Sequence, residues 1–284
     1  KFLINKNKMN EIINRESMNY DVVIIGAGPA GLSTAIKLKQ LNSEISVCLI
    51  EKGAEVGAHI LSGNVFETKA LDELIPDWKK KGAPVKTKVS KEKFLFLTKN
   101  SYFSWPTWLL PAVQQNHNNY IISLANLCRW LGEQAENLGV EIFPGFPASK
   151  ILYDKDGSVQ GVQTGDMGID KRGEKKDSFE PGINLIGKVT VFAEGCRGHL
   201  GKELIKKYNL DKGKSPQQYG IGFKEIWEIE SKNHHEGLVM HSVGWPIDNS
   251  SYGGSFCYHA ENNQVFIGYV LGLDYKNPYT FSLM

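Results

Sequence analysis

The chain has 284 residues, of which 41% are hydrophobic, so it is long and apolar enough for one large α/β domain or two interleaved ones. Its 33 Lys and Arg residues nearly balance 31 Asp and Glu residues, and a net charge of +2 gives no electrostatic case for binding nucleic acid. No stretch approaches the roughly 20 consecutive apolar residues of a transmembrane helix. The Lys- and Asn-rich start of the chain predicts a disordered tail over residues 1–18.

The strongest signal is a glycine-rich turn that follows an apolar run. The segment YDVVIIGAGPAG contains Gly26, Gly28 and Gly31, and a second apolar run, VCLIE, ends in Glu51, 20 positions after Gly31. We expect a strand before the turn, a helix over 30–41 and a second strand up to the acidic residue. This order and spacing are the fingerprint of a dinucleotide-binding unit.

Each residue of the fingerprint has a physical task. Gly26 allows a sharp turn, Gly28 lets a pyrophosphate approach the backbone, and Gly31 lets the helix pack closely on the strand. The helix N-terminus offers unpaired N–H groups and a partial positive charge to phosphate groups. The carboxylate of Glu51 can accept hydrogen bonds from ribose hydroxyls, and its charge disfavours the 2′-phosphate of NADP.

Three segments between the second strand and residue 113 lack a clear periodicity. Residues 53–63, with the sequence GAHILSG near their end, are glycine-rich and predict a loop that returns toward the cofactor. The lysine-rich stretch 79–93 predicts a solvated loop. Residues 102–113 carry Trp105, Trp108 and two prolines, which argue against a long helix. From this stretch alone we favour a flap that covers the core over a surface that enters a bilayer interface.

A helix is expected over 120–138, ended by Gly139. A short strand at 140–143 and a hairpin over 151–164 follow, because Asp-Gly lies between two apolar runs of that hairpin. Residues 165–182 are polar and predict an exposed excursion.

A buried strand over 188–193 ends in Glu194 and Gly195, which suggests a second approach of the backbone to the cofactor. From residue 219 onward, four aromatic-rich runs predict a separate antiparallel sheet. The chain then stops without a closing element, and we expect the natural protein to continue. The four cysteines are widely separated, so we expect no metal or iron–sulfur site within this chain.

Several segments together resemble one family. They include VVIIGAGPAGLSTAIKLKQL, VCLIEKGAEVGAHILSGNVF, LIPDWKKKGAPV, VTVFAEGCRGHLGKEL, YGIGFKEIWEI and VGWPIDNSSYGGSFCYH. These segments are similar to the electron transfer flavoprotein–ubiquinone oxidoreductase family over residues 21–278. The later segments are far more specific than the glycine fingerprint.

The resemblance implies an enzyme that takes electrons from reduced electron transfer flavoprotein and passes them to ubiquinone through FAD and a [4Fe–4S] cluster. The family works on the matrix side of the mitochondrial inner membrane, or at the cytoplasmic membrane in a bacterium. It is attached to the membrane surface without a transmembrane helix. Residues 56–77 and the tryptophan flap, 102–113, are the candidate segments for this attachment. The family's cluster cysteines lie near its C-terminus, beyond this chain.

The resemblance and the fingerprint together give the expected site residues. Those expected to bind FAD are Gly26, Ala27, Gly28, Pro29, Ala30, Gly31, Glu51, Lys52, Gly57, His59, Ser62, Gly63, Glu194 and Gly195. The resemblance places Gly253 and Gly254 against the quinone ring, where adjacent glycines would open a flat slot and leave N–H groups for a quinone oxygen. Without the resemblance, a hairpin turn is an equal interpretation of these two glycines.

We therefore expect a mixed α/β (α+β) fold with an FAD-binding Rossmann-like domain formed by 19–80 and 118–215. An antiparallel quinone-binding domain, formed by 81–117 and 216–284, would be interleaved with it. The alternatives are a flavin reductase of the FixC or geranylgeranyl-reductase type and a catalytically silent FAD-binding fragment. No catalytic residue is assigned, and the sequence does not single out a proton donor for the quinone among its scattered histidines.

Overall fold

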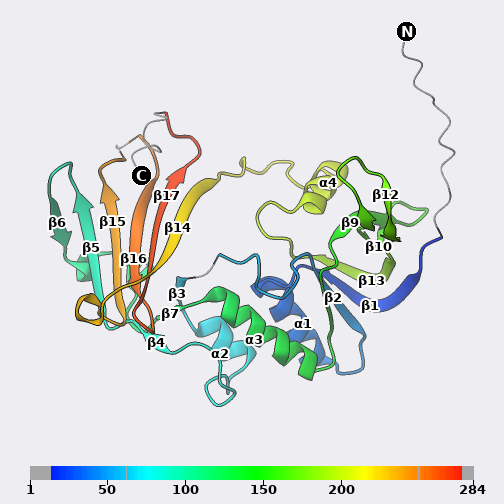
Figure 1. Ribbon diagram of the computed structural model, residues 1–284, viewed down its shortest axis with the longest axis horizontal. Coiled ribbons are helices and arrows are strands. Elements are labelled where there is room, and N and C mark those ends of the chain that lie inside the picture. The colour runs from blue at the N-terminus through cyan, green and yellow to red at the C-terminus, as the bar shows by residue number, and fades with distance from the viewer. Residues whose placement is uncertain (1–13, 62, 248–249, 277–284) are drawn as a thin grey trace, which may run out of the picture. The chain divides into compact units, whose positions relative to one another are not determined.

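The computed structural model describes residues 14–61, 63–247 and 250–276 (Figure 1). The chain divides into two compact units, Lys1–Ala58 with Leu131–Tyr208 and His59–Trp130 with Asn209–Met284, and each is described only over the residues just given. Each unit is built from two separate segments of the chain, and both mix helices with strands. The boundaries expected from the sequence, at 80, 118 and 215, separate an FAD-binding part from a quinone-binding part. This division by ligand stays a proposal.

The first unit is organised around a six-stranded mixed sheet. Its first four strands are parallel, and its last two form an antiparallel hairpin. In order across the sheet they are β8 (Glu141–Pro144), β2 (Val47–Glu51), β1 (Ser17–Ile25), β13 (Asn184–Phe192), β10 (Val159–Thr164) and β9 (Ala148–Tyr153). The helices are α1 (Pro29–Leu41), α4 (His199–Tyr208) and the second half of α3 (Leu124–Asn137).

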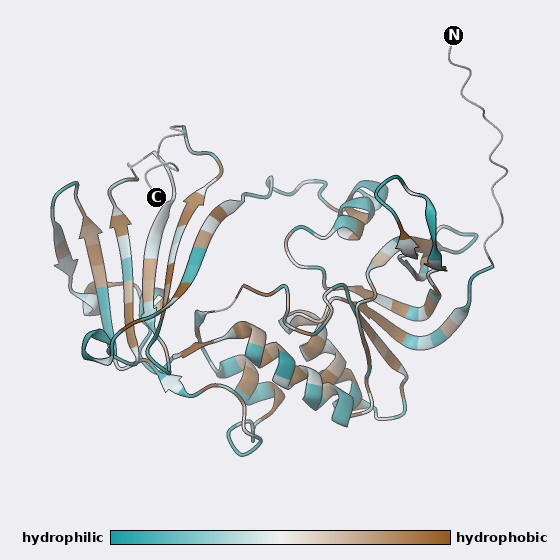
Figure 2. Cartoon of the chain, viewed as in Figure 1, coloured by the Kyte–Doolittle hydropathy of each residue, from teal (hydrophilic) through white to brown (hydrophobic). Residues whose placement is uncertain are grey.

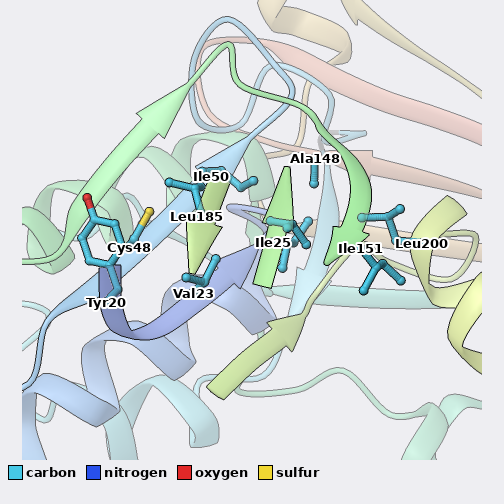
Figure 3. Close-up of a cluster of buried hydrophobic side chains, with 10 residues drawn as sticks. Tyr20, Val23, Ile25, Cys48, Ile50, Ala148, Ile151, Leu185 and Leu200 are labelled. Carbon is cyan, nitrogen blue, oxygen red and sulfur yellow. The ribbon is translucent and has the colours of Figure 1, made fainter. Parts of the chain in front are cut away.

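Continuous apolar runs place β1 and β2 in the interior of this sheet. All four residues from Val47 to Ile50 are at most 1% exposed, as expected of parallel strands covered on both faces. Cys48 and Ile50 belong, with side chains of β1, to a buried cluster that extends to β9, β10, β13 and α4. Figure 3 shows part of it, with Ile151 of β9 close to Leu200 of α4. The strands and helix around the glycine turn are thus confirmed.

Three expectations for this part of the chain need correction. The disordered tail expected over 1–18 is shorter than predicted, because β1 begins at Ser17 and Arg15 forms an ion pair with Asp166. Residues 1–13 lie outside the described residues. The helix expected over 120–138 begins at residue 124, since 120–122 pair as a strand instead. The excursion at 165–182 is exposed as expected, but it folds as a hairpin of β11 (Met167–Ile169) and β12 (Lys175–Glu180).

The second unit contains a six-stranded sheet and a small three-stranded one. The large sheet runs in the order β14 (Gly220–Glu228), β17 (Gln264–Gly272), β16 (Gly253–His259), β15 (Leu238–Gly244), β5 (Lys91–Leu97) and β6 (Tyr102–Trp105). The small sheet runs β3 (Asn64–Phe66), β7 (Tyr120–Ile122) and β4 (Thr87–Lys88), and the helices are α2 (Lys69–Leu74) and the short η1 (Thr107–Leu109), η2 (Ala112–Gln114) and η3 (Ser231–Asn233). The four strands expected after residue 219 are confirmed. The sheet is antiparallel except for the unexpected parallel pair of β5 and β15.

The lysine-rich stretch 79–93 is not a simple solvated loop. Val85, Thr87 and Val89 are buried while the lysines between them are exposed, which is the period of two that marks a strand. This segment forms β4 and leads into β5. The high lysine content led to the prediction of a loop, although the lysines alternate with Val85, Thr87 and Val89.

The tryptophan flap does not cover a core, contrary to the interpretation favoured from the sequence. Trp108 is 76% exposed, Trp105 46% and Val113 92%. β6 is the last strand of the large sheet and has β5 as its single neighbour, so its side chains have little to pack against. Figure 2 shows the apolar character of the neighbouring strand β5. The flap is therefore an exposed apolar segment.

Candidate functional site

The glycine turn lies where β1 and β2 end. Gly26 has φ of +106°, and a Cβ there would lie 2.5 Å from the carbonyl oxygen of Ala193. A Cβ on Gly31 would lie 2.0 Å from the carbonyl oxygen of Gly26. Both separations are impossible for real atoms, so the chain can follow this path only with glycine at both positions.

Gly28 differs from its two neighbours in the motif. Its φ is −81°, and a Cβ built on it would meet nothing within 4 Å. It stands directly before α1, whose first residue is Pro29 and whose N-terminus has neither a side-chain cap nor an acidic residue in the first turn. Open space in front of an uncapped helix N-terminus fits a pyrophosphate, because the N–H groups of Ala30 and Gly31 can donate to it.

Glu51 is fixed beside this turn. Its Oε2 accepts a hydrogen bond from the N–H of Ala27 at 3.0 Å, and its Oε1 accepts one from the N–H of Gly53 at 2.8 Å. A carboxylate has about four acceptor positions, so the two that are left can receive ribose hydroxyls. Glu51 thus links the end of β2 to the phosphate turn and keeps capacity for a ligand.

Glu194 has a different environment from the one expected. Its Oε2 accepts from the N–H of Gly201 at 2.7 Å and its Oε1 from that of Leu200 at 3.3 Å, with His199 Nδ1 3.4 Å away. The carboxylate therefore caps the N-terminus of α4, which argues against direct contact with the cofactor. Gly195 has φ of +79° and nothing within 4 Å of an added Cβ, so its backbone remains accessible.

The other expected FAD-binding residues lie on the loop after β2. Lys52 and His59 are exposed, while Gly57 is buried with φ of +88°. Gly57 belongs to the first unit, and His59 and Gly63 belong to the second. Ser62 lies outside the described residues.

Gly63 is held by a lysine that the sequence did not single out. Lys224 of β14 donates from Nζ to the carbonyl oxygen of Gly63 at 3.0 Å, and the same Nζ lies 4.8 Å from the centre of the Phe266 ring. Burial lowers the pKa of Lys224 to about 8. The lysine shares its face of β14 with Gly222 and Ile226, both of which are exposed, so the strand pattern gave no signal that would have singled it out.

Gly253 and Gly254 begin β16 and are strand residues, not a hairpin turn. They pair with Leu271 and Val270 of β17, so their backbone groups take part in the sheet. A Cβ on Gly254 would lie 2.5 Å from the carbonyl oxygen of Ser242.

The described residues contain no group of three or more His, Cys, Asp or Glu side chains placed to hold a metal ion. None of the four cysteines, all of which are described, forms a disulfide. No helix in the described part of the chain is both long and apolar enough to span a bilayer.

Comparison with known proteins first defines the class. Residues 20–166 match the family model of pyridine nucleotide-disulphide oxidoreductases. Among solved structures, a geranylgeranyl bacteriochlorophyll reductase-like protein from Thermoplasma acidophilum is similar, with a TM-score of 0.63 over 94% of this chain and 60% of that one. At 12% identity this likeness concerns the fold alone. The expected mixed α/β class with an FAD-binding, Rossmann-like oxidoreductase fold is confirmed.

More specific matches define the family. Residues 219–283 match the model described as ETF-QO, ubiquinone-binding. The electron transfer flavoprotein-ubiquinone oxidoreductase of Pseudomonas aeruginosa is 55% identical over 94% of this chain, and the mitochondrial one of Homo sapiens is 51% identical over 96%. The chain belongs to the electron transfer flavoprotein–ubiquinone oxidoreductase family. It spans about half the length of these relatives, 50% and 46% respectively.

Proposed function

We propose that the protein passes electrons from reduced electron transfer flavoprotein through FAD to ubiquinone. The observation that carries this proposal is that one chain of this family contains both an open glycine turn after β1 and two adjacent glycines, Gly253 and Gly254, at the start of β16. Gly26, Gly28 and Gly31 would hold the pyrophosphate of FAD, and Glu51 would hold its ribose. When bound, FAD supplies the capacity to accept and release electrons, while the chain supplies binding and orientation.

The second unit would hold the quinone. Gly253 and Gly254 remove side chains from the sheet where a planar ring could lie, and Lys224 fixes Gly63 of the loop after β2. The [4Fe–4S] cluster implied by the family resemblance has no ligand set among the described residues. We place it in the half of the family's length that this chain does not span.

The exposed flap would attach the protein to the surface of a membrane. Trp, Leu and Val side chains project from β6, η1 and η2, and tryptophan is favoured at the boundary between lipid and water. The segment 56–77 is a second candidate contact. Since mitochondrial and bacterial relatives both exist, we propose the matrix side of the mitochondrial inner membrane, or the cytoplasmic membrane in a bacterium.

Replacement of Gly28 tests the cofactor site without disturbing the fold. The G28A variant should unfold at the wild-type temperature, because its Cβ meets nothing, but should bind FAD about tenfold more weakly or worse, a loss of about 1.4 kcal/mol. The measurement is FAD affinity by fluorescence titration, with thermal unfolding of both proteins. G132A is the matched control. Gly132 lies inside α3, and an alanine there makes only ordinary contacts with Val56. Unchanged FAD affinity in G28A would refute the assignment of this turn.

Replacement of the flap tryptophans tests the membrane contact. The double variant W105S/W108S should sediment less with liposomes than the wild type, while keeping its unfolding temperature. W227S removes a tryptophan of similar exposure, 54%, from β14 and serves as the control. Equal sedimentation of all three proteins would refute the flap as an anchor.

The alternative of a flavin reductase predicts NADPH oxidation without the flavoprotein partner, which the proposed function excludes.

A further inference from the structure

Five neighbouring strands of the large sheet, β14, β17, β16, β15 and β5, can be followed in Figure 1. One face of these strands carries a continuous row of residues. Each pairs in register with the next. In order from β14 to β5 the members are Lys224, Gly268, Phe256, His241 and Phe94. A Cβ on Gly268 would lie 2.1 Å from the ring of Phe256, so this ring lies across the glycine. The row thus combines two polar side chains with a flat aromatic surface.

The adjacent row on the same face is flat and apolar. Side chains two positions apart on a strand share a face, so Gly222, Val270 and Gly254 lie beside the first row. Gly254 also approaches Val243, whose Cγ1 would be 3.6 Å from an added Cβ. His241 is two residues from Val243 on the same strand. The polar ring of His241 is therefore a diagonal neighbour of Gly254 on this face.

Among the described residues, the ring of His241 has one hydrogen-bond partner, Tyr258. Its Nε2 lies 2.8 Å from the hydroxyl oxygen of Tyr258, and the two rings are 5.4 Å apart at an angle of 74°. Tyr258 is 8% exposed and stacks on Phe256 at 4.7 Å, so its position is fixed from behind. Because Nε2 is engaged with Tyr258, Nδ1 is the ring nitrogen of His241 that can gain and lose a proton.

We propose that His241 delivers protons to the quinone oxygen and that Tyr258 is its positioning residue; this assignment rests on the proposed function. Reduction of a quinone takes two electrons, which come from reduced FAD, and two protons. His241 takes a proton from solvent at Nδ1; that N–H bond then breaks as an O–H bond forms on the quinone. Two such passages balance the two electrons, and the hydroxyl of Tyr258 accepts the Nε2–H throughout.

The ionisation of both groups agrees with these roles. Burial lowers the pKa of His241, which makes its protonated ring a stronger acid, and burial raises the pKa of Tyr258 to about 12, which keeps its hydroxyl neutral. The charged groups on this face of the sheet are Lys224 and Glu228 of β14 and Glu92 of β5. The small sheet adds the apolar Val65 and Ile121. The rate of quinone reduction should therefore fall as pH rises through the pKa of His241, below its ordinary value of 6.5.

The test uses the whole chain loaded with FAD, reduced by dithionite without oxygen and mixed with a short-chain ubiquinone. Reappearance of oxidised flavin absorbance is followed in H2O and D2O between about pH 5 and about pH 8. The variants are H241Q and Y258F, and H259Q is the matched control because His259 follows Tyr258 on β16 and faces the other side of the sheet. Ferricenium, which accepts an electron without a proton, is the comparison oxidant. Ubiquinone binding is measured separately by quenching of tryptophan fluorescence.

H241Q should slow reoxidation by ubiquinone about 100-fold and remove its pH dependence and solvent isotope effect. Y258F should slow it about tenfold and shift the pH midpoint. Both should bind ubiquinone and react with ferricenium as the wild type does, and H259Q should be unaffected in all assays. Normal ubiquinone rates in H241Q would overturn this assignment and leave the proposed function intact. If the wild type binds no ubiquinone, or its reduced flavin is not oxidised by it, the proposed function fails and this assignment with it.

Discussion

The two proposed sites differ in what the protein uses to make them. In the first unit the phosphate turn is made of backbone, and two of its three glycines, Gly26 and Gly31, are required because a Cβ would strike a carbonyl oxygen of the chain itself. In the second unit the proposed quinone site is made of side chains on a sheet face, with a histidine, a tyrosine and a lysine at set positions. A backbone site recognises a group that all dinucleotides share, whereas a side-chain site can supply protons and charge.

This difference predicts unequal costs for the same chemical change. G31A should cause the largest loss, because its Cβ would lie 2.0 Å from a backbone oxygen that cannot move without opening the turn. We expect the free energy of unfolding to fall by about 3 kcal/mol and FAD affinity to be lost. Chemical denaturation and FAD titration measure the two effects. A stable G31A protein that binds FAD normally would break the comparison.

G268A is the counterpart on the sheet face. Its Cβ would lie 2.1 Å from the ring of Phe256, which can rotate away, so we expect a loss of only about 1 kcal/mol. The displaced ring would loosen Tyr258, with which it stacks, and should therefore alter the tyrosine's fluorescence or NMR signals. A loss as large as that of G31A would show that the face is as rigid as the turn.

The smallest expected effect concerns the charge of Lys224. Its pKa is about 8 in the folded chain against an ordinary value of 10.5, so the unfolded chain binds its proton more strongly. Between these two pH values the unfolded state therefore carries more protons, and the stability of the wild type should rise with pH relative to K224M. Above this window the difference should level off. Thermal unfolding of both proteins at pH values on either side of the window measures it, and parallel curves would contradict the burial of this amine.

Local sequence signals predicted the geometry of the glycine turn better than the side-chain contacts of the large sheet. The turn, its flanking strands and Glu51 follow one another within a short segment, so spacing and composition suffice. The pairing of His241 with Tyr258 depends on the register between β15 and β16, and Lys224 reaches Gly63 across 161 positions. A sequence pattern cannot contain such contacts. The exposure of the flap likewise depends on β6 being the last strand, which composition does not reveal.

The interleaving of the two units also bears on how the chain acquires its structure during synthesis. β1 needs β13, which starts at Asn184, and β5 needs β15, which starts at Leu238. Neither sheet can be completed by the part of the chain that leaves the ribosome first. Loop closure over such separations slows folding and leaves apolar strands such as β2 and β5 without partners in the meantime. The nascent chain should therefore depend on chaperones until its last strands have emerged.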